Sequence, residues 1–196
     1  MMGWLDWLKP APAPAPAARE DDDQVVHAYD AFQEAFERTV GHEGAYSADP
    51  TDRGNWTSGQ VGVGVMKGTK FGISAASYSG LDIISLTLDD AHAIYRRDFW
   101  NGPGLDQLPP RLAREVFDAA VNSGPRAAII WLQAALGVLQ DGRIGPETVA
   151  AARAASDPSA VVARLSGKRL MSMTDMATWD HHGRGWARRI ARNLMS

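Results

Sequence analysis

The chain has 196 residues, of which 45% are hydrophobic, so it can bury one sizeable core or one domain with a small appendage. Its formal net charge of −3 argues against a nucleic-acid-binding protein, and the absence of cysteine excludes disulfides and thiol chemistry. The charge is uneven, because residues 164–196 contain seven basic and two acidic residues, a net charge of +5. A basic segment of this kind suits an anionic envelope surface, although a solvated helix face has the same composition.

The first part of the chain is expected to form a flexible extension, residues 1–24, outside the core. Residues 1–9 are amphipathic and carry Trp4 and Trp7, but they lack the positive-then-apolar order of a secretory signal. The Pro-Ala repeat over residues 10–17 is typical of a stiff polyproline-like spacer. No apolar run in the chain approaches the roughly 20 residues that a transmembrane helix needs.

The next residues have helical spacing up to a glycine. Val25, Phe32 and Val40 belong to an apolar series that recurs every three or four residues, and Gly41 ends it. Residues 49–74 are then rich in glycine and polar side chains, which predicts loops. Within them, the alternation of valine and glycine at 61–65 indicates a small β-hairpin or an irregular loop.

The remainder of the chain has mainly helical patterns. Residues 87–90 resemble a capping box that opens a helix to Phe99, and further helices are expected from Pro109, Pro146 and Pro158. One helix is expected to end before Gly137. The last helix carries Trp186 and Ile190 on one apolar stripe. Both of these residues, and Trp131 in an earlier helix, are expected in the core. The fold class is therefore mainly α (α+β): a helical bundle with a small β-hairpin or loop insertion near the active site.

Glu43 is the main candidate for catalysis. It stands between Gly41 and Gly44, at or just past the end of the first expected helix. The negative end of the helix dipole and any burial both disfavour an ionised carboxylate there and raise its pKa. A carboxyl group that is protonated near neutral pH can act as a general acid, whereas an ordinary solvated glutamate has the same sequence context.

Two further carboxylates follow Glu43 at short range. Asp49 and Asp52 lie in the turn-rich segment, which can fold back and face Glu43 across a cleft. Glycoside hydrolysis needs such a pair: one carboxylic acid protonates the glycosidic oxygen, and the other stabilises positive charge or activates water, which a nearby threonine can hold. Aspartate is also an ordinary turn residue, so both positions have a structural alternative.

Other side chains are weaker candidates for substrate contact. Tyr46, Phe71 and Trp100 can stack on sugar faces, or they can belong to the core. Asn122 can cap a helix end or line a cleft. The five histidines show no zinc-ligand spacing, so no metal and no cofactor are expected.

Several motifs together carry a resemblance to a known family. The sequence resembles the glycoside hydrolase family 108 muramidases, which include phage endolysins and secretion-linked bacterial muramidases, from about residue 27 to residue 193. The motifs are HEGAYSADP at 42–50, GTKFGIS at 68–74, AHAIYRRDFW at 91–100, FDAAVNSG at 117–124 and, in the peptidoglycan-binding half, DGRIGPET at 141–148.

The resemblance implies a lysozyme-like fold and cleavage of the β-1,4 bond between N-acetylmuramic acid and N-acetylglucosamine. The family's catalytic glutamate falls on Glu43, and Asp52 matches the aspartate that follows it in many phage lysozymes. The assisting threonine is either Thr57, which fits by spacing, or Thr69, which fits the motif. Ala45 stands where the family usually has a second glycine.

The same resemblance implies how the protein is organised and used. Residues 25–104 are expected to be the catalytic part and residues 105–196 the peptidoglycan-binding part, packed as one globule and acting as a monomer. The expected partner is the peptidoglycan glycan strand, with no nucleic acid. The protein would wait in the host cytoplasm and reach the wall through a holin. Two alternatives are a lytic transglycosylase and a non-catalytic wall-binding or secretion-assisting protein.

Overall fold

The computed structural model describes residues 31–41 and 44–195. The expected extension at residues 1–24 and the candidate acid Glu43 lie outside the described residues. Residues 31–39 are helical, as the apolar spacing predicts. In the part of the chain that the structure describes, no helix is long and apolar enough to cross a membrane.

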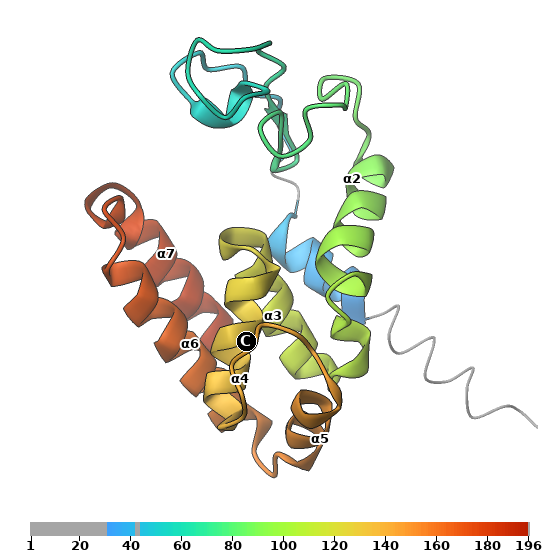
Figure 1. The fold of residues 1–196 in the computed structure, drawn as a ribbon, viewed down its shortest axis with the longest axis vertical. Helices are drawn as coiled ribbons and strands as arrows, with labels where there is room; N and C mark the ends of the chain where they lie inside the picture. The colour runs from blue at the N-terminus through green and yellow to red at the C-terminus, as the bar shows by residue number, and fades with distance from the viewer. Residues whose placement is uncertain (1–30, 42–43, 196) are drawn as a thin grey trace, which may run out of the picture.

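The described chain is mainly helical, with one very small sheet (Figure 1). Its elements after residues 31–39 are η2 (Arg53–Asn55), β1 (Thr69–Lys70), β2 (Ile73–Ser74), α2 (Leu88–Tyr95), η3 (Arg96–Asn101), η4 (Leu105–Gln107), α3 (Pro110–Ser123), α4 (Pro125–Leu136), α5 (Pro146–Ala154), α6 (Pro158–Thr174) and α7 (Trp179–Leu194). The fold class expected from the sequence, a helical bundle with a small β insertion, is confirmed.

An aromatic cluster holds the N-terminal helical residues against the bundle. The ring centroid of Phe32 lies 5.4 Å from that of Trp100 and 5.7 Å from that of Phe117, and all three side chains are buried. These residues come from residues 31–39, η3 and α3, so the core joins elements from distant parts of the sequence. Edge-to-face packing of this kind adds to the stabilisation from burying large apolar rings.

The C-terminal helices form the body of the bundle. Helix α3 packs on α4, α4 on α6, and α6 on α7 (Figure 1). Proline stands in the first turn of α3, α4, α5 and α6, where its missing N–H costs nothing. Helix α4 ends at Gly137, whose φ of 74° gives a left-handed cap, so the predicted stop is confirmed.

Helix α2 begins as predicted and then changes its helical geometry. Thr87 and Asp90 form the expected capping box, with Thr87 N donating to Asp90 Oδ2 at 2.9 Å and Asp90 N donating to Thr87 Oγ1 at 3.1 Å. Its α-helical geometry ends at Tyr95 and changes into the π-helical turn η3, which continues the helical path to Asn101, where the predicted stop at residues 100–104 begins. Gly102 N closes this turn by donating to Arg97 O at 2.9 Å, a bond to the fifth residue back.

Residues 44–86 form a loop-rich lobe that projects from the bundle (Figure 1). Of the two alternatives expected at 61–65, the irregular loop is confirmed, since those residues form turns with exposed valines. The antiparallel hairpin is instead β1–β2, with Lys70 opposite Ile73. Phe71 and Gly72 connect the strands with φ values of 52° and 75°, the two positive φ values of a type I′ turn, whose twist matches the right-handed twist of the strands.

Candidate active site

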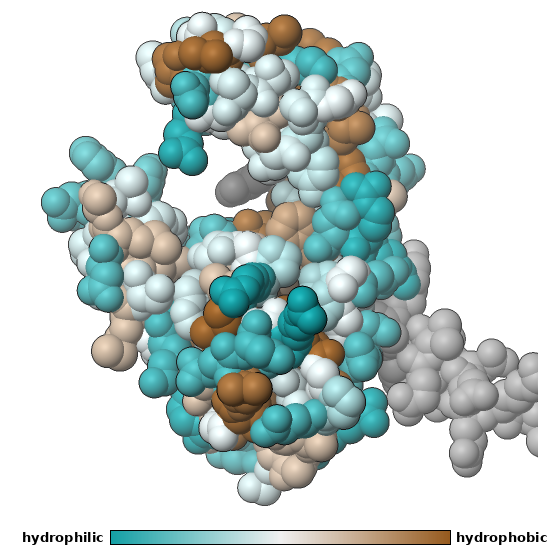
Figure 2. Space-filling view, in the orientation of Figure 1, coloured by the Kyte–Doolittle hydropathy of each residue, from teal (hydrophilic) through white to brown (hydrophobic). Residues whose placement is uncertain are grey.

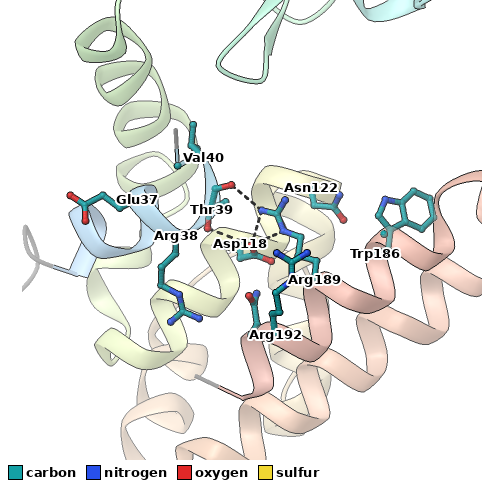
Figure 3. A pocket seen from close by; sticks show the side chains of 12 residues that line it. Glu37, Arg38, Thr39, Val40, Asp118, Asn122, Trp186, Arg189 and Arg192 are labelled. Atoms are coloured by element: carbon teal, nitrogen blue, oxygen red, sulfur yellow. Dashed lines mark hydrogen bonds and ion pairs between the residues drawn. The ribbon is translucent and has the colours of Figure 1, made fainter. Parts of the chain in front are cut away.

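A polar cleft lies where the N-terminal helical segment ends against α3 and α7 (Figure 3). Its volume is roughly 700 Å³. Its lining residues are Glu37, Arg38, Thr39, Val40, Gly41, Asp118, Asn122, Gly185, Trp186, Arg189, Arg192 and Asn193. We call this space the α3–α7 cleft. Glu43 follows Gly41 by two residues, so the chain that forms one wall of the cleft leads directly to the candidate acid.

Asp118 fixes the floor of this cleft. Arg169 Nη1 donates to Asp118 Oδ2 at 2.6 Å, and Arg189 Nε donates to Asp118 Oδ1 at 2.8 Å. Thr39 Oγ1 also donates to Asp118 Oδ1 at 3.4 Å, and Arg189 Nη2 donates to the Thr39 carbonyl at 3.4 Å. One aspartate on α3 therefore connects α6, α7 and the end of the helical segment that precedes Glu43.

Charge balance explains how the Asp118 carboxylate tolerates burial. Burial by itself raises the pKa of Asp118, but the hydrogen bonds and charges of Arg189 and Arg169 outweigh it, so the pKa lies below its ordinary value. Glu115, one turn earlier on α3, lacks such a partner set. Burial and the neighbouring Asp118 charge raise the pKa of Glu115.

A second hollow separates the loop-rich lobe from the ends of α6 and α7 (Figure 2). The lobe holds most of the residues that the sequence singled out. Asn55, fully buried, organises them: its Nδ2 donates to the Asp49 carbonyl at 2.9 Å, and its Oδ1 accepts from Thr69 Oγ1 at 2.7 Å. Sequence reasoning missed Asn55, because nothing in its sequence context distinguishes a buried asparagine from a turn residue.

Asp49 and Asp52 are brought close together in the lobe, and both have turn contacts. Asp52 is exposed and caps η2, with its Oδ1 accepting from Gly54 N at 2.8 Å. Asp49 Oδ1 accepts from Thr51 Oγ1 at 2.7 Å and from Thr51 N at 2.8 Å, and these bonds lower the pKa of Asp49. Both side chains are available to solvent, so their turn roles leave oxygen atoms for a ligand.

The two candidate threonines lie in different surroundings. Thr69 pairs with Ser47, through hydrogen bonds of 2.8 Å in both directions between their backbone groups, so it lies beside the strand that leads away from Glu43. Thr57 Oγ1 instead accepts from Val65 N at 3.0 Å, at the base of the exposed valine loop. Gly64 packs so tightly on the Thr57 hydroxyl that an added Cβ would lie 2.6 Å from it. The structure therefore pairs Thr69 with Ser47, four residues after Glu43 in the sequence, whereas the hydroxyl of Thr57 serves the valine loop.

The three aromatic candidates differ in how far their side chains are exposed. The interpretation of Trp100 as a sugar-stacking residue is wrong, because its side chain is 1% exposed and its ring packs in the core. Tyr46 is exposed at 39%, and its hydroxyl donates to the Lys67 carbonyl at 3.2 Å. The half-buried Phe71 covers Gly44, where an added Cβ would lie 2.2 Å from the Phe71 ring. Substrate contact by Tyr46 and Phe71 stays a prediction.

Two residues near the α3–α7 cleft complete the set of sequence candidates. Asn122 lines the cleft, and its Oδ1 accepts from Arg169 Nη2 at 3.2 Å and from Ser123 Oγ at 3.2 Å. The expectation that Trp186 belongs to the core is wrong, because it is only half-buried and lines the same cleft. It packs there beside His182, at a centroid distance of 5.6 Å.

The turn at residues 141–145 is held by a buried glutamine on α4. Gln133 Nε2 donates to Asp141 Oδ1 at 2.7 Å, and Gln133 Oε1 accepts from Gly142 N at 2.9 Å. The bond from Gln133, together with one from Arg143 N at 2.9 Å, lowers the pKa of Asp141, and the whole set gives the turn a structural role. A second depression of about 610 Å³ lies beside this turn, lined in part by Asp98, Arg126 and Arg143.

The described chain combines a helical bundle, a loop-rich lobe and a polar cleft bounded by residues 37–41, α3 and α7, and this arrangement fits a mainly helical, lysozyme-like protein. Comparison with known families agrees. The model described as Glycosyl hydrolase 108 matches residues 36–124, and the one described as Predicted Peptidoglycan domain matches residues 127–191.

The solved structure of SagA from Brucella abortus is 30% identical to this chain, with a TM-score of 0.71 over 85% of this chain and 93% of SagA. The chain therefore belongs to the glycosyl hydrolase 108 family. Together with the peptidoglycan domain that follows, this makes the protein a glycoside hydrolase that acts on peptidoglycan. A search among curated proteins gave no match.

Proposed function

We propose that the protein is an N-acetylmuramidase that hydrolyses the β-1,4 bond between N-acetylmuramic acid and N-acetylglucosamine. One observation carries the proposal: the glycosyl hydrolase 108 match over residues 36–124 includes Glu43 together with the lobe that presents Asp52 and Thr69. In this proposal Glu43 is the general acid that protonates the glycosidic oxygen. Asp52 is the second carboxylate, which either activates water or stabilises the oxocarbenium-like transition state.

Thr69 is the proposed assisting residue. Its hydroxyl donates its proton to Asn55, which leaves its oxygen lone pairs to accept a hydrogen bond from the attacking water. Thr57 has the weaker case, since its hydroxyl serves the backbone of the valine loop. Tyr46 and Phe71 belong to the lobe and are proposed to contact the sugars.

Hydrolysis can be tested by measuring dye release from labelled peptidoglycan. Asp52→Asn should lower kcat by about 10²- to 10⁴-fold, the usual range for a lost acid–base group. Asp82→Asn is the matched control, because Asp82 is an exposed aspartate of the same lobe that belongs to no candidate set. Thr69→Val should lower kcat more than Thr57→Val. Equal losses at Asp82 and Asp52 would contradict the assignment.

A lytic transglycosylase is the second candidate. It would use Glu43 as acid and then base, and the muramic acid hydroxyl would replace water, so Asp52 would be dispensable. The turn bonds of Asp49 and Asp52 are compatible with this candidate, because they account for the positions of both carboxylates without a role in catalysis. The glycosyl hydrolase 108 match over residues 36–124, which includes Glu43, argues against a non-catalytic wall-binding or secretion-assisting protein. Full activity of Asp52→Asn would support it.

We further propose that the protein acts as a monomeric phage endolysin, held in the host cytoplasm until a holin gives it access to the wall. The basic final segment, net +5 over residues 164–196, would then assist contact with an anionic envelope surface. Expression in bacteria with and without a holin tests this. Lysis only with the holin is expected, and lysis without it would contradict the proposed route.

A further inference from the structure

The α3–α7 cleft combines cationic and aromatic side chains in a way that an uncharged sugar does not require. Arg189 and Arg192 line it from α7, and Trp186 provides an aromatic wall on the same helix (Figure 3). Arg188, the neighbour of Arg189 in the sequence, is exposed and lies outside the cleft lining. The basic side chains of α7 thus divide between the cleft and the open surface.

Arg189 is held in a fixed orientation for a ligand. Its hydrogen bonds within the described chain use Nε and Nη2, on Asp118 and the Thr39 carbonyl, which leaves Nη1 for an acceptor. Its side chain remains 32% exposed, whereas Asp118 beneath it is 8% exposed. A guanidinium that is fixed on one side and open on the other is well suited to bind a carboxylate.

The charge in the cleft remains positive after the internal pairing is counted. Asp118 is shared by Arg169 and Arg189, so this cluster has one more positive charge than it has negative charges. Arg192 adds another positive charge, and its side chain makes no hydrogen bond or ion pair with the described residues. Glu37 offsets part of this charge at the other wall, where it accepts a hydrogen bond from Gln33.

We propose that the α3–α7 cleft binds the peptide stem of peptidoglycan through its carboxylates, with Arg192 and Arg189 as the recognising groups and Trp186 against the peptide. This inference rests on the proposed function, the cleavage of peptidoglycan glycan strands. In an intact strand the free carboxylates belong to the stem peptides. A volume of roughly 700 Å³ suits a short peptide. The cleft would thus select glycan strands that still carry stems.

The position of the cleft in the chain supports this role. Gly41 lines the cleft, and the candidate acid Glu43 is two residues further on. Recognition of a stem and cleavage of the strand would therefore use adjoining parts of one chain segment. A lipid or polymer surface is the other outcome of the test, because Arg188 and Arg192 are both exposed and a surface would contact them alike, whereas a ligand in the cleft would contact Arg192 and not Arg188.

Direct binding tests the proposal without requiring hydrolysis. The probes are N-acetylmuramyl-L-alanyl-D-glutamate, its analogue with both glutamate carboxyls amidated, and N-acetylmuramic acid, each titrated calorimetrically into the full chain. The wild type should bind the charged conjugate about tenfold more tightly than the amidated one. Arg192→Gln should bind the charged conjugate about three- to tenfold more weakly and bind the other two probes as the wild type does. A loss of this size is in the range expected for one partly exposed charged hydrogen bond.

Arg188→Gln is the matched control and should leave all three affinities unchanged. Equal losses for Arg188→Gln and Arg192→Gln would overturn the proposal in favour of a general electrostatic field. If N-acetylmuramic acid bound as tightly as the dipeptide conjugate, the proposal would be overturned, because the cleft would then recognise the lactyl carboxylate of the sugar and not the peptide. Glu43→Gln should lose hydrolysis but retain binding of the charged conjugate. This result tests stem recognition and hydrolysis separately, so either proposal can fail without the other.

Discussion

Asp118→Asn is expected to destabilise the whole bundle. The substitution keeps the shape of the side chain but removes the charge that two arginines share. Arg169 is 3% exposed, and its Nε already lacks a hydrogen-bond partner within the described chain. Removing one member of a buried ion pair costs about 3–5 kcal/mol, because the remaining charge stays buried without compensation. An asparagine still accepts one hydrogen bond, so the lower end of that range, about 3 kcal/mol, is expected.

Urea unfolding followed by circular dichroism measures this loss. With a slope of about 2 kcal/mol per M, the midpoint should fall by about 1–2 M. Asp106→Asn is the control, since Asp106 is exposed in η4 and makes no side-chain cap bond. A control change below about 0.5 kcal/mol is expected. Equal midpoints for Asp118→Asn and Asp106→Asn would refute the argument.

The pH dependence gives a second check on Asp118. Its pKa is lowered in the folded protein, so its stabilising contribution is present above the unfolded pKa and is lost as the pH falls through the folded value. The difference between wild type and Asp118→Asn should therefore be constant near neutrality and shrink below about pH 4. A difference that grew on acidification would contradict the assigned direction.

Three other predictions concern single sites. Glu115→Gln should raise the urea midpoint at pH 7 but not below pH 4, because a raised carboxyl pKa means that ionisation destabilises the folded state; an unchanged midpoint at pH 7 would refute it. Gly44→Ala should lower Tm, since its Cβ would meet the Phe71 ring, and shrinking that ring in Gly44→Ala/Phe71→Leu should recover part of the loss. Gln133→Leu should cost about 1–3 kcal/mol by leaving buried partners of the Asp141 turn unpaired, and an unaltered midpoint would count against that role.

The helical pattern of the sequence was sufficient to predict most of the bundle. Apolar spacing, the Thr87 cap and the Gly137 stop act over a few residues, so they could be interpreted without the fold. At 61–65 the sequence left a hairpin and an irregular loop open, because alternating valines have the spacing of a strand but do not show whether a partner strand exists. The turn of the β1–β2 hairpin depends on Phe71 adopting a positive φ, which sequence preferences oppose.

The site was only partly predictable, because its contacts join distant residues. Trp100 and Trp186 are both aromatic residues in helical segments, yet one is buried in the core and the other lines a cleft. Asp118 appeared in a family-like motif without an assigned role, and its partners Arg169 and Arg189 lie on two other helices. The assignments of Glu43, Asp52 and Thr69 remain predictions, and so does the division of the chain at residue 104.

Mass spectrometry of fragments released from purified peptidoglycan tests the central proposal most directly. Wild type, Glu43→Gln and the surface control Glu147→Gln would be compared on the same material. A muramidase predicts fragments that end in reducing N-acetylmuramic acid from wild type and Glu147→Gln, and their loss in Glu43→Gln. Anhydro-muramic ends would contradict hydrolysis and indicate a transglycosylase, and the absence of fragments from all three proteins would contradict catalysis itself.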